Sequence, residues 1–104
     1  MSIVIEQESC NGCGRCLAVC PGALLCANAK GRAEIRYPAD CWSCAACVKS
    51  CARGAIALYS APACGGRGGL LRARREGEIL HWVISLPDGT QRTISVDRRS
   101  ANRY

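Results

Sequence analysis

The sequence predicts an α+β fold, in which a β-α-β-β-α-β unit with pseudo-twofold symmetry is followed by a small three-stranded antiparallel β-sheet. Two cysteine-rich blocks repeat in the first half of the chain, a glycine-rich stretch follows them, and the last third alternates apolar with polar residues. A chain of 104 residues has room for one domain and a short extension. We expect a first domain over residues 1–60, a glycine-rich linker over 61–69, a β meander over 70–96 and a polar tail over 97–104.

Ten of the residues are cysteine, and eight of these fall in two blocks of identical spacing. The blocks CNGCGRCLAVC and CWSCAACVKSC begin at Cys10 and Cys41. Each follows the pattern C-x2-C-x2-C-x3-C, and the second repeats the first 31 residues later. Such a repeat indicates two copies of one structural unit.

The spacing within each block suits a cubane-shaped 4Fe–4S cluster. Three cysteines with two residues between neighbours curl a loop so that their thiolates face one side, and the fourth points away from that loop. The fourth thiolate then reaches the cluster of the other block, as in the bacterial two-cluster ferredoxins. In such a ferredoxin-like domain we expect two 4Fe–4S clusters, the first bound by Cys10, Cys13, Cys16 and Cys51 and the second by Cys20, Cys41, Cys44 and Cys47.

Zinc sites and disulfides fit the same cysteines less well. Zinc sites use separated C-x2-C pairs, and a third cysteine in the run has no role in a tetrahedral site. Disulfides need an oxidising compartment, whereas the first ten residues lack the basic and apolar regions of a signal peptide. No stretch approaches the ~18 apolar residues of a membrane span. We therefore expect a cytoplasmic protein without a membrane span.

Short strands and helices are expected around the two blocks. The expected strands lie at residues 2–5, 24–27, 34–37 and 55–59, and short helices begin within residues 17–20 and 48–51. The polar turn at residues 28–31 predicts a hairpin between the second and third strands. The fourth strand is expected to pair with the first.

Three further strands are expected beyond the linker, at residues 69–74, 79–86 and 91–96. In the middle strand one face is apolar, and it consists of Leu80, Trp82, Ile84 and Leu86. Residues 87–90, with the sequence PDGT, predict a tight turn. Because a meander of this size buries little by itself, its apolar face must lie on the cluster domain or on another protein.

Outside the blocks, single residues have mostly structural interpretations. Trp82 is expected to pack on the apolar face, whereas His81 is expected to be exposed or to face a partner. Cys26 is interpreted as a small buried hydrophobic residue and Cys64 as a structural residue of the linker. The remaining candidates are basic residues that form a solvated face or contact an acidic partner, namely Arg67, Arg72, Arg74 and Arg75.

The second block and the segment after the linker carry a family resemblance. The stretches DCWSCAACVKSCARGAI and ILHWVISLPDGTQRTI resemble the β-subunit of adenylylsulfate reductase over residues 40–96. The resemblance implies a ferredoxin domain with an added three-stranded sheet that docks on an FAD-containing subunit of the fumarate reductase type. In that family a tryptophan after the first cysteine of the second block lies between the flavin and the nearer cluster. Here that residue is Trp42, which either lies on such an electron path or packs against its cluster or an interface. The resemblance implies that the second cluster is flavin-proximal.

The sequence predicts that this chain relays electrons and performs no bond chemistry of its own. All-cysteine ligation leaves no open iron site, and the chain has no carboxylate pair, Ser/His/Asp set or phosphate-binding loop. We expect a subunit that passes electrons between an FAD-containing oxidoreductase subunit and an external donor or acceptor. The alternative is a free, diffusible two-cluster ferredoxin. A nucleic-acid-binding module is disfavoured because exposed aromatics are few. The plain spacing of CNGCGRC, where the family carries an insertion, leaves the partner's substrate open.

Cluster binding changes the meaning of the formal charge of +6. Eight thiolates and two oxidised cores together add about four negative charges, so the loaded chain is near +2. Residues 1–64 contain six basic and four acidic residues, whereas residues 65–104 contain eight and four. We therefore expect a mildly acidic cluster domain with a basic arm that contacts a partner.

Overall fold

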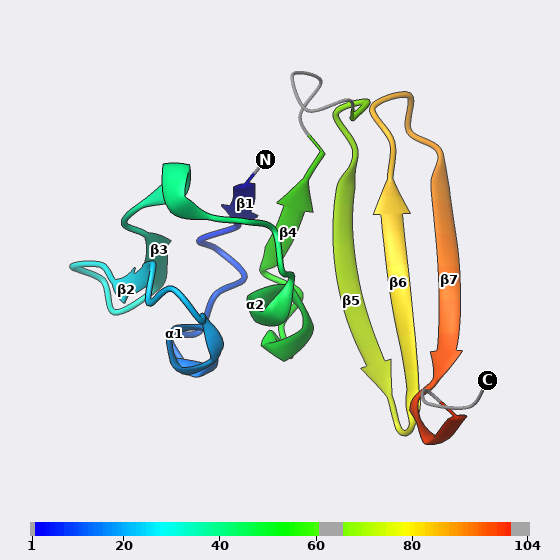
Figure 1. Ribbon diagram of the computed structural model, residues 1–104, viewed down its shortest axis with the longest axis horizontal. Helices are drawn as coiled ribbons and strands as arrows, with labels where there is room; N and C mark the ends of the chain where they lie inside the picture. Colours follow the sequence, from blue (N-terminus) through cyan, green and yellow to red (C-terminus); the bar gives the residue numbers. More distant parts are fainter. Residues whose placement is uncertain (1, 61–65, 101–104) are drawn as a thin grey trace.

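The computed structural model describes residues 2–60 and 66–100, and its strands and short helices follow the order in Figure 1. The first half contains β1 (Ser2–Ile5), α1 (Arg15–Val19), β2 (Leu25–Ala27), β3 (Ala33–Ile35), the 3-10 turn η1 (Pro38–Asp40), α2 (Ala46–Ser50) and β4 (Ile56–Tyr59). This order confirms the expected β-α-β-β-α-β unit. The equivalent helices begin 31 residues apart, as the cysteine blocks do, and each begins two residues earlier than we expected.

Each strand pair of the first half joins one strand from each copy of the repeat. β1 pairs antiparallel with β4, and β2 pairs antiparallel with β3. The two helices pack against each other, with α1 beside β2 and α2 beside β4. The fold therefore brings the end of each cysteine block next to the other block.

The last third of the chain extends the β1–β4 pair into one five-stranded antiparallel sheet. β5 (Leu70–Glu76) pairs with β4, β6 (Ile79–Ser85) pairs with β5, and β7 (Gln91–Asp97) forms the far edge (Figure 1). The three strands therefore do not form the separate three-stranded sheet that we expected. Leu58 and Tyr59 pair with Leu71 and Leu70, which covers an edge of β4 that would otherwise lie unpaired.

The hydrophobic core lies between α2 and this sheet. Val48 of α2 and Ile56 of β4 are nearly inaccessible, and Ala73 of β5 and Leu80 of β6 belong to the same buried cluster. Trp82 is partly buried against this cluster, which confirms its expected packing role. The apolar face of the meander therefore lies in part on the cluster domain, and this contact fixes β5 and β6 relative to the cysteine blocks.

The segment after β7, which we expected to be a polar tail, begins with a short turn. Arg98–Ser100 form the 3-10 turn η3, and the Arg98 amide donates to the carbonyl of Glu78 at 2.9 Å. The Arg98 guanidinium also donates to the carbonyl of Gly77 at 2.6 Å, so the chain turns back over the β5–β6 hairpin. Cys64 and residues 101–104 lie outside the described residues. Within the described ranges, no helix is long and apolar enough to cross a membrane.

Left-handed backbone conformations recur at equivalent positions of the two copies. Gly12 and Ser43 have φ values of 74° and 65°, and Gly14 and Ala45 have φ values of 79° and 64°. These positions are 31 residues apart, so the second copy keeps the loop shape of the first without its glycines. A left-handed conformation costs a non-glycine residue roughly 1–2 kcal/mol. The second block therefore contains strained positions that the rest of the folded structure offsets.

Glycine at position 45 is expected to stabilise the protein. Ala45→Gly removes the left-handed strain, although greater freedom of the unfolded chain cancels part of the gain. The net gain of about 0.5–1 kcal/mol corresponds to a rise of a few °C in the thermal midpoint. The measurement is thermal loss of circular dichroism in the cluster-loaded protein. The matched control is Ala18→Gly within α1, which should lower the midpoint because glycine destabilises helices. Equal shifts for both variants would contradict the strain at Ala45.

Candidate metal centres

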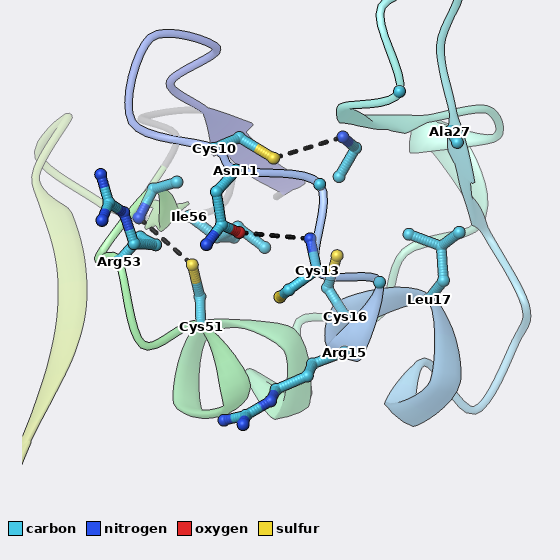
Figure 2. Close-up of a pocket in the computed structure, with 15 residues that line it drawn as sticks. Cys10, Asn11, Cys13, Arg15, Cys16, Leu17, Ala27, Cys51, Arg53 and Ile56 are labelled. Atoms are coloured by element: carbon cyan, nitrogen blue, oxygen red, sulfur yellow. Dashed lines mark hydrogen bonds between the residues drawn. The ribbon is translucent and has the colours of Figure 1, made fainter.

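Four cysteines of the first expected set surround one cavity. Cys10, Cys13 and Cys16 come from the loop and first turn of α1, and Cys51 comes from the end of α2 (Figure 2). The cavity has a volume of about 40 Å³. Cys20, the fourth cysteine of the first block, does not line it.

The second expected set surrounds another cavity, of about 20 Å³. Cys41, Cys44 and Cys47 approach it from the second block, and Cys20 approaches it from the end of α1. Trp42 also lines this cavity. The structure therefore brings together the cysteines of each expected set, with the fourth member of each coming from the opposite copy.

Backbone amides donate to the cysteine sulfurs at the edges of both cavities. The Leu24 amide donates to Cys20 Sγ and the Ala55 amide to Cys51 Sγ, both at 3.4 Å. These two hydrogen bonds lie at equivalent positions of the two copies of the repeat. The Ala33 amide donates to Cys10 Sγ at 3.4 Å, and this bond, followed by one from Gly12, lowers the pKa of the Cys10 thiol. Hydrogen bonds of this kind stabilise a thiolate ligand and tune a cluster.

The donor residues include some that the sequence did not reveal. Small residues let backbone amides approach the sulfurs, and within the blocks these are Gly12, Gly14, Ser43, Ala45 and Ala46. Among these, Gly12 contributes at Cys10. The other donors lie after the blocks, in Leu24, Ala33 and Ala55. For Leu24 and Ala55 the signal was the repeat itself, because they occupy equivalent positions four residues after Cys20 and Cys51. The repeat gives no such signal for Ala33.

Two cysteines are buried enough to resist ionisation as free thiols. Burial raises the pKa of the Cys16 thiol, and it raises the pKa of the Cys47 thiol to about 11. Each side chain points into the protein from the first turn of a helix. A cationic iron core would supply the positive charge that the corresponding thiolates need.

The arrangement of thiols fits an iron–sulfur cluster. Within residues 2–60 and 66–100, no three Cys, His, Asp or Glu side chains converge as ligands of a single metal ion. The sulfurs border two cavities, and left-handed positions recur at equivalent places in the two loops. Soft thiolate ligands are those that iron–sulfur clusters use.

Trp42 lies on the surface beside the second cavity. Its side chain is 59% exposed. The six-membered ring packs over Gly22, where an added Cβ would lie 3.0 Å from Cζ3 of Trp42. At the equivalent position of the first copy stands Asn11, whose Oδ1 accepts from the Cys13 amide at 3.2 Å. The two cavities therefore differ in the residue after the first cysteine, and the second presents an exposed aromatic ring.

Two single-residue expectations need correction. His81 is only partly exposed: its side chain is 15% accessible, with Nδ1 2.7 Å from Ser95 Oγ and Nε2 3.0 Å from Glu76 Oε2, so the fully exposed alternative is wrong. Neighbouring strands supply both partners, which the sequence pattern of one strand does not show. Cys26 is only partly buried, because it faces outward opposite Glu34 in the two-stranded β2–β3 sheet, with Sγ 3.7 Å from Glu34 Oε1.

Comparisons with known proteins match the part of the chain that contains both cysteine blocks. The family model of the 4Fe-4S dicluster domain matches residues 9–56. Adenylylsulfate reductase subunit beta of Megalodesulfovibrio gigas is 27% identical over 96 residues, which cover 86% of this chain and 58% of that subunit. An uncharacterised ferredoxin of Methanocaldococcus jannaschii is 33% identical over 60 residues, which cover 56% of this chain and 78% of that protein.

A solved structure extends the similarity to the added strands. It is described as adenosine 5'-phosphosulfate reductase in complex with substrate, and it matches 89% of this chain with a TM-score of 0.75 and 26% identity. The match covers 66% of that chain, and this protein spans 58% of the length of the reductase subunit from M. gigas. From its cysteine spacing, its fold and these matches, the chain belongs to the ferredoxin family with a 4Fe–4S dicluster domain, and it is similar to the beta subunit of adenylylsulfate reductase.

Proposed function

We propose that this chain binds two 4Fe–4S clusters in the cytoplasm and relays single electrons between an FAD-containing oxidoreductase subunit and an external carrier. The observation that carries the proposal is the division of eight cysteines between two cavities, four to each. The first cluster would be held by Cys10, Cys13, Cys16 and Cys51, and the second by Cys20, Cys41, Cys44 and Cys47. Four thiolates on each cluster leave no iron position for a substrate, so the clusters supply electron transfer only.

The added strands favour a permanent protein partner. On the sheet, Leu58, Leu71 and Ile84 line a groove of about 410 Å³ together with Leu70 and Leu86. On β7, Ile94 is 55% exposed. The part of the added strands that does not pack against α2 thus leaves apolar surface exposed, which is typical of a subunit interface. The similarity to a reductase beta subunit covers these strands and points to an FAD-containing subunit as that partner.

The second cavity is the better candidate for the flavin side. Trp42 lines this cavity and presents more than half of its side chain to the surface. An exposed indole beside a cluster suits both packing against a partner and a short electron path. We therefore assign the cluster of Cys20, Cys41, Cys44 and Cys47 to the flavin side and the other cluster to the external carrier.

A free ferredoxin is the second candidate function, because a relative of that description is 33% identical over the cluster domain. Purification of the tagged chain from its native host distinguishes the two. The subunit proposal predicts a stable yellow-brown complex with one flavin per chain, in which reduction of the flavin is followed by reduction of the clusters. A chain that elutes alone, loaded with clusters and without flavoprotein, would instead establish the diffusible ferredoxin.

Replacement of Trp42 tests the assignment of the flavin side. In the purified complex, Trp42→Ala should slow electron transfer from flavin to cluster by about tenfold or more, because the aromatic contact is lost while all eight cysteines stay in place. Stopped-flow absorbance measures this rate, and iron analysis verifies that both clusters remain. Tyr37→Ala is the matched control, since Tyr37 is 50% exposed but does not line the second cavity. Equal rates in both variants would reduce Trp42 to a packing residue.

A further inference from the structure

A groove of about 350 Å³ separates the end of α2 from β5, and its charged lining residues are all basic. We call it the basic groove. One wall comes from the cluster domain and the other from the added strands, so neither half of the chain forms it alone. Its six charged side chains are Arg15, Lys49, Arg53, Arg72, Arg74 and Arg75.

Few carboxylates balance this charge. Arg72 lies 3.8 Å from Glu6, and Arg74 lies 3.4 Å from Glu76. Among the described residues, the remaining four basic side chains of the groove make no ion pair within 4 Å, and all four are exposed. The groove therefore presents a concentrated positive field to solvent.

The basic groove adjoins the first cavity. Arg15, Cys51 and Arg53 line both. Cys51 is a proposed ligand of the first cluster, and it also lines the groove. A protein seated in the groove would thus lie against a residue that binds that cluster. Neither Trp42 nor any of the four cysteines of the second cavity lines the groove.

We propose that the basic groove docks a small acidic redox protein that exchanges electrons with the cluster of Cys10, Cys13, Cys16 and Cys51. This inference rests on the proposed relay function and names its external carrier by chemistry. One electron leaves the reduced cofactor of the carrier and lowers the cluster core from charge 2+ to 1+; the reverse step returns it. No bond forms or breaks, and no proton is required.

The lining favours a protein over a nucleic acid. Single-stranded nucleic acids bind by base stacking on aromatic side chains as well as by charge. None of the residues that line the groove is aromatic. Complementary charge alone suits a transient carrier, because it speeds encounter and orientation without slowing release.

The test uses the full chain with its clusters and an acidic plant-type 2Fe–2S ferredoxin as the probe. Lys49→Glu with Arg75→Glu reverses two groove charges that make no ion pair among the described residues. The control, Arg36→Glu with Arg92→Glu, makes the same change of net charge at exposed positions outside the groove. Surface plasmon resonance at several salt concentrations measures association and dissociation. We expect the groove variant to associate about tenfold more slowly and to lose most of its salt dependence, whereas the control changes little.

Each outcome decides the inference. Equal loss of binding in both variants would show that only net charge affects binding, and it would overturn the groove as the docking site. Tighter binding of single-stranded DNA than of the ferredoxin probe would overturn the choice of partner. Iron content and visible absorbance must match in all variants, so a folding defect is recognised directly. Because this assay contains no flavoprotein, its failure leaves the flavin relay standing, and failure of the flavin relay does not alter the measured docking.

Discussion

Replacement of Cys51 by alanine should remove the cluster of the first cysteine block, although Cys51 belongs to the second. Cys51 lines the first cavity with Cys10, Cys13 and Cys16, and it is absent from the second cavity. The chain should lose about half of its iron, because four irons leave with one cluster. Electron paramagnetic resonance of the reduced protein should show one cluster signal in place of two coupled ones.

Three further variants make the assignment of Cys51 unambiguous. Cys13→Ala removes a ligand of the same proposed cluster, so its spectrum and reduction potential should match those of Cys51→Ala. Cys44→Ala and Cys20→Ala should both give the complementary spectrum, in which the other cluster remains. If Cys51→Ala instead resembles Cys44→Ala, each block binds its own cluster and the crossed ligation is wrong. The comparison needs no prior assignment of either signal, because only the pairing of the variants matters.

Much of the cluster domain follows from the sequence because the ligand spacing constrains the backbone strongly. The 31-residue repeat predicts the two helices, the strand order and the grouping of cysteines from opposite copies. The strand ends differ by one or two residues, as at β3, which is Ala33–Ile35 and not residues 34–37. Such ends depend on pairing partners, which local pattern does not specify.

Features that join distant segments were not predictable in this way. The alternating pattern of the last third predicts three strands, but it does not predict that Leu71 pairs with Leu58 to make one continuous sheet. The surroundings of His81 depend on Ser95 of the adjacent strand in the same way. The basic groove is a third case. The sequence predicts a basic group of arginines in the last third of the chain. Arg15, Lys49 and Arg53 lie beside these arginines only because α2 packs beside β5.

Replacement of Gly12 by alanine should destabilise the first cluster site, although it leaves every cysteine ligand in place. Gly12 has φ of 74°, and an added Cβ would collide with the carbonyl oxygen of Gly31 in the turn between β2 and β3. That turn is tied to the first loop, because the Asn28 side chain donates to Gln7 Oε1 at 2.8 Å and Gln7 Nε2 donates to the Ala33 carbonyl at 2.7 Å. Displacement of the turn therefore also disturbs the amide of Ala33, which donates to Cys10 Sγ.

The expected loss of stability from Gly12→Ala is about 2–4 kcal/mol, from left-handed strain and steric overlap together. The first cluster should be released faster on exposure to a chelator, and the second should stay bound. Gly14→Ala separates the two causes, because Gly14 has a similar φ of 79° with no atom within 4 Å of an added Cβ. It should lose only the strain contribution, about 1–2 kcal/mol. Equal release rates in the two variants would show that the close approach of the hairpin turn does not stabilise the first cluster site. A larger loss in Gly12→Ala would make the β2–β3 turn part of the support of the first cluster, even though it supplies no cysteine ligand to it.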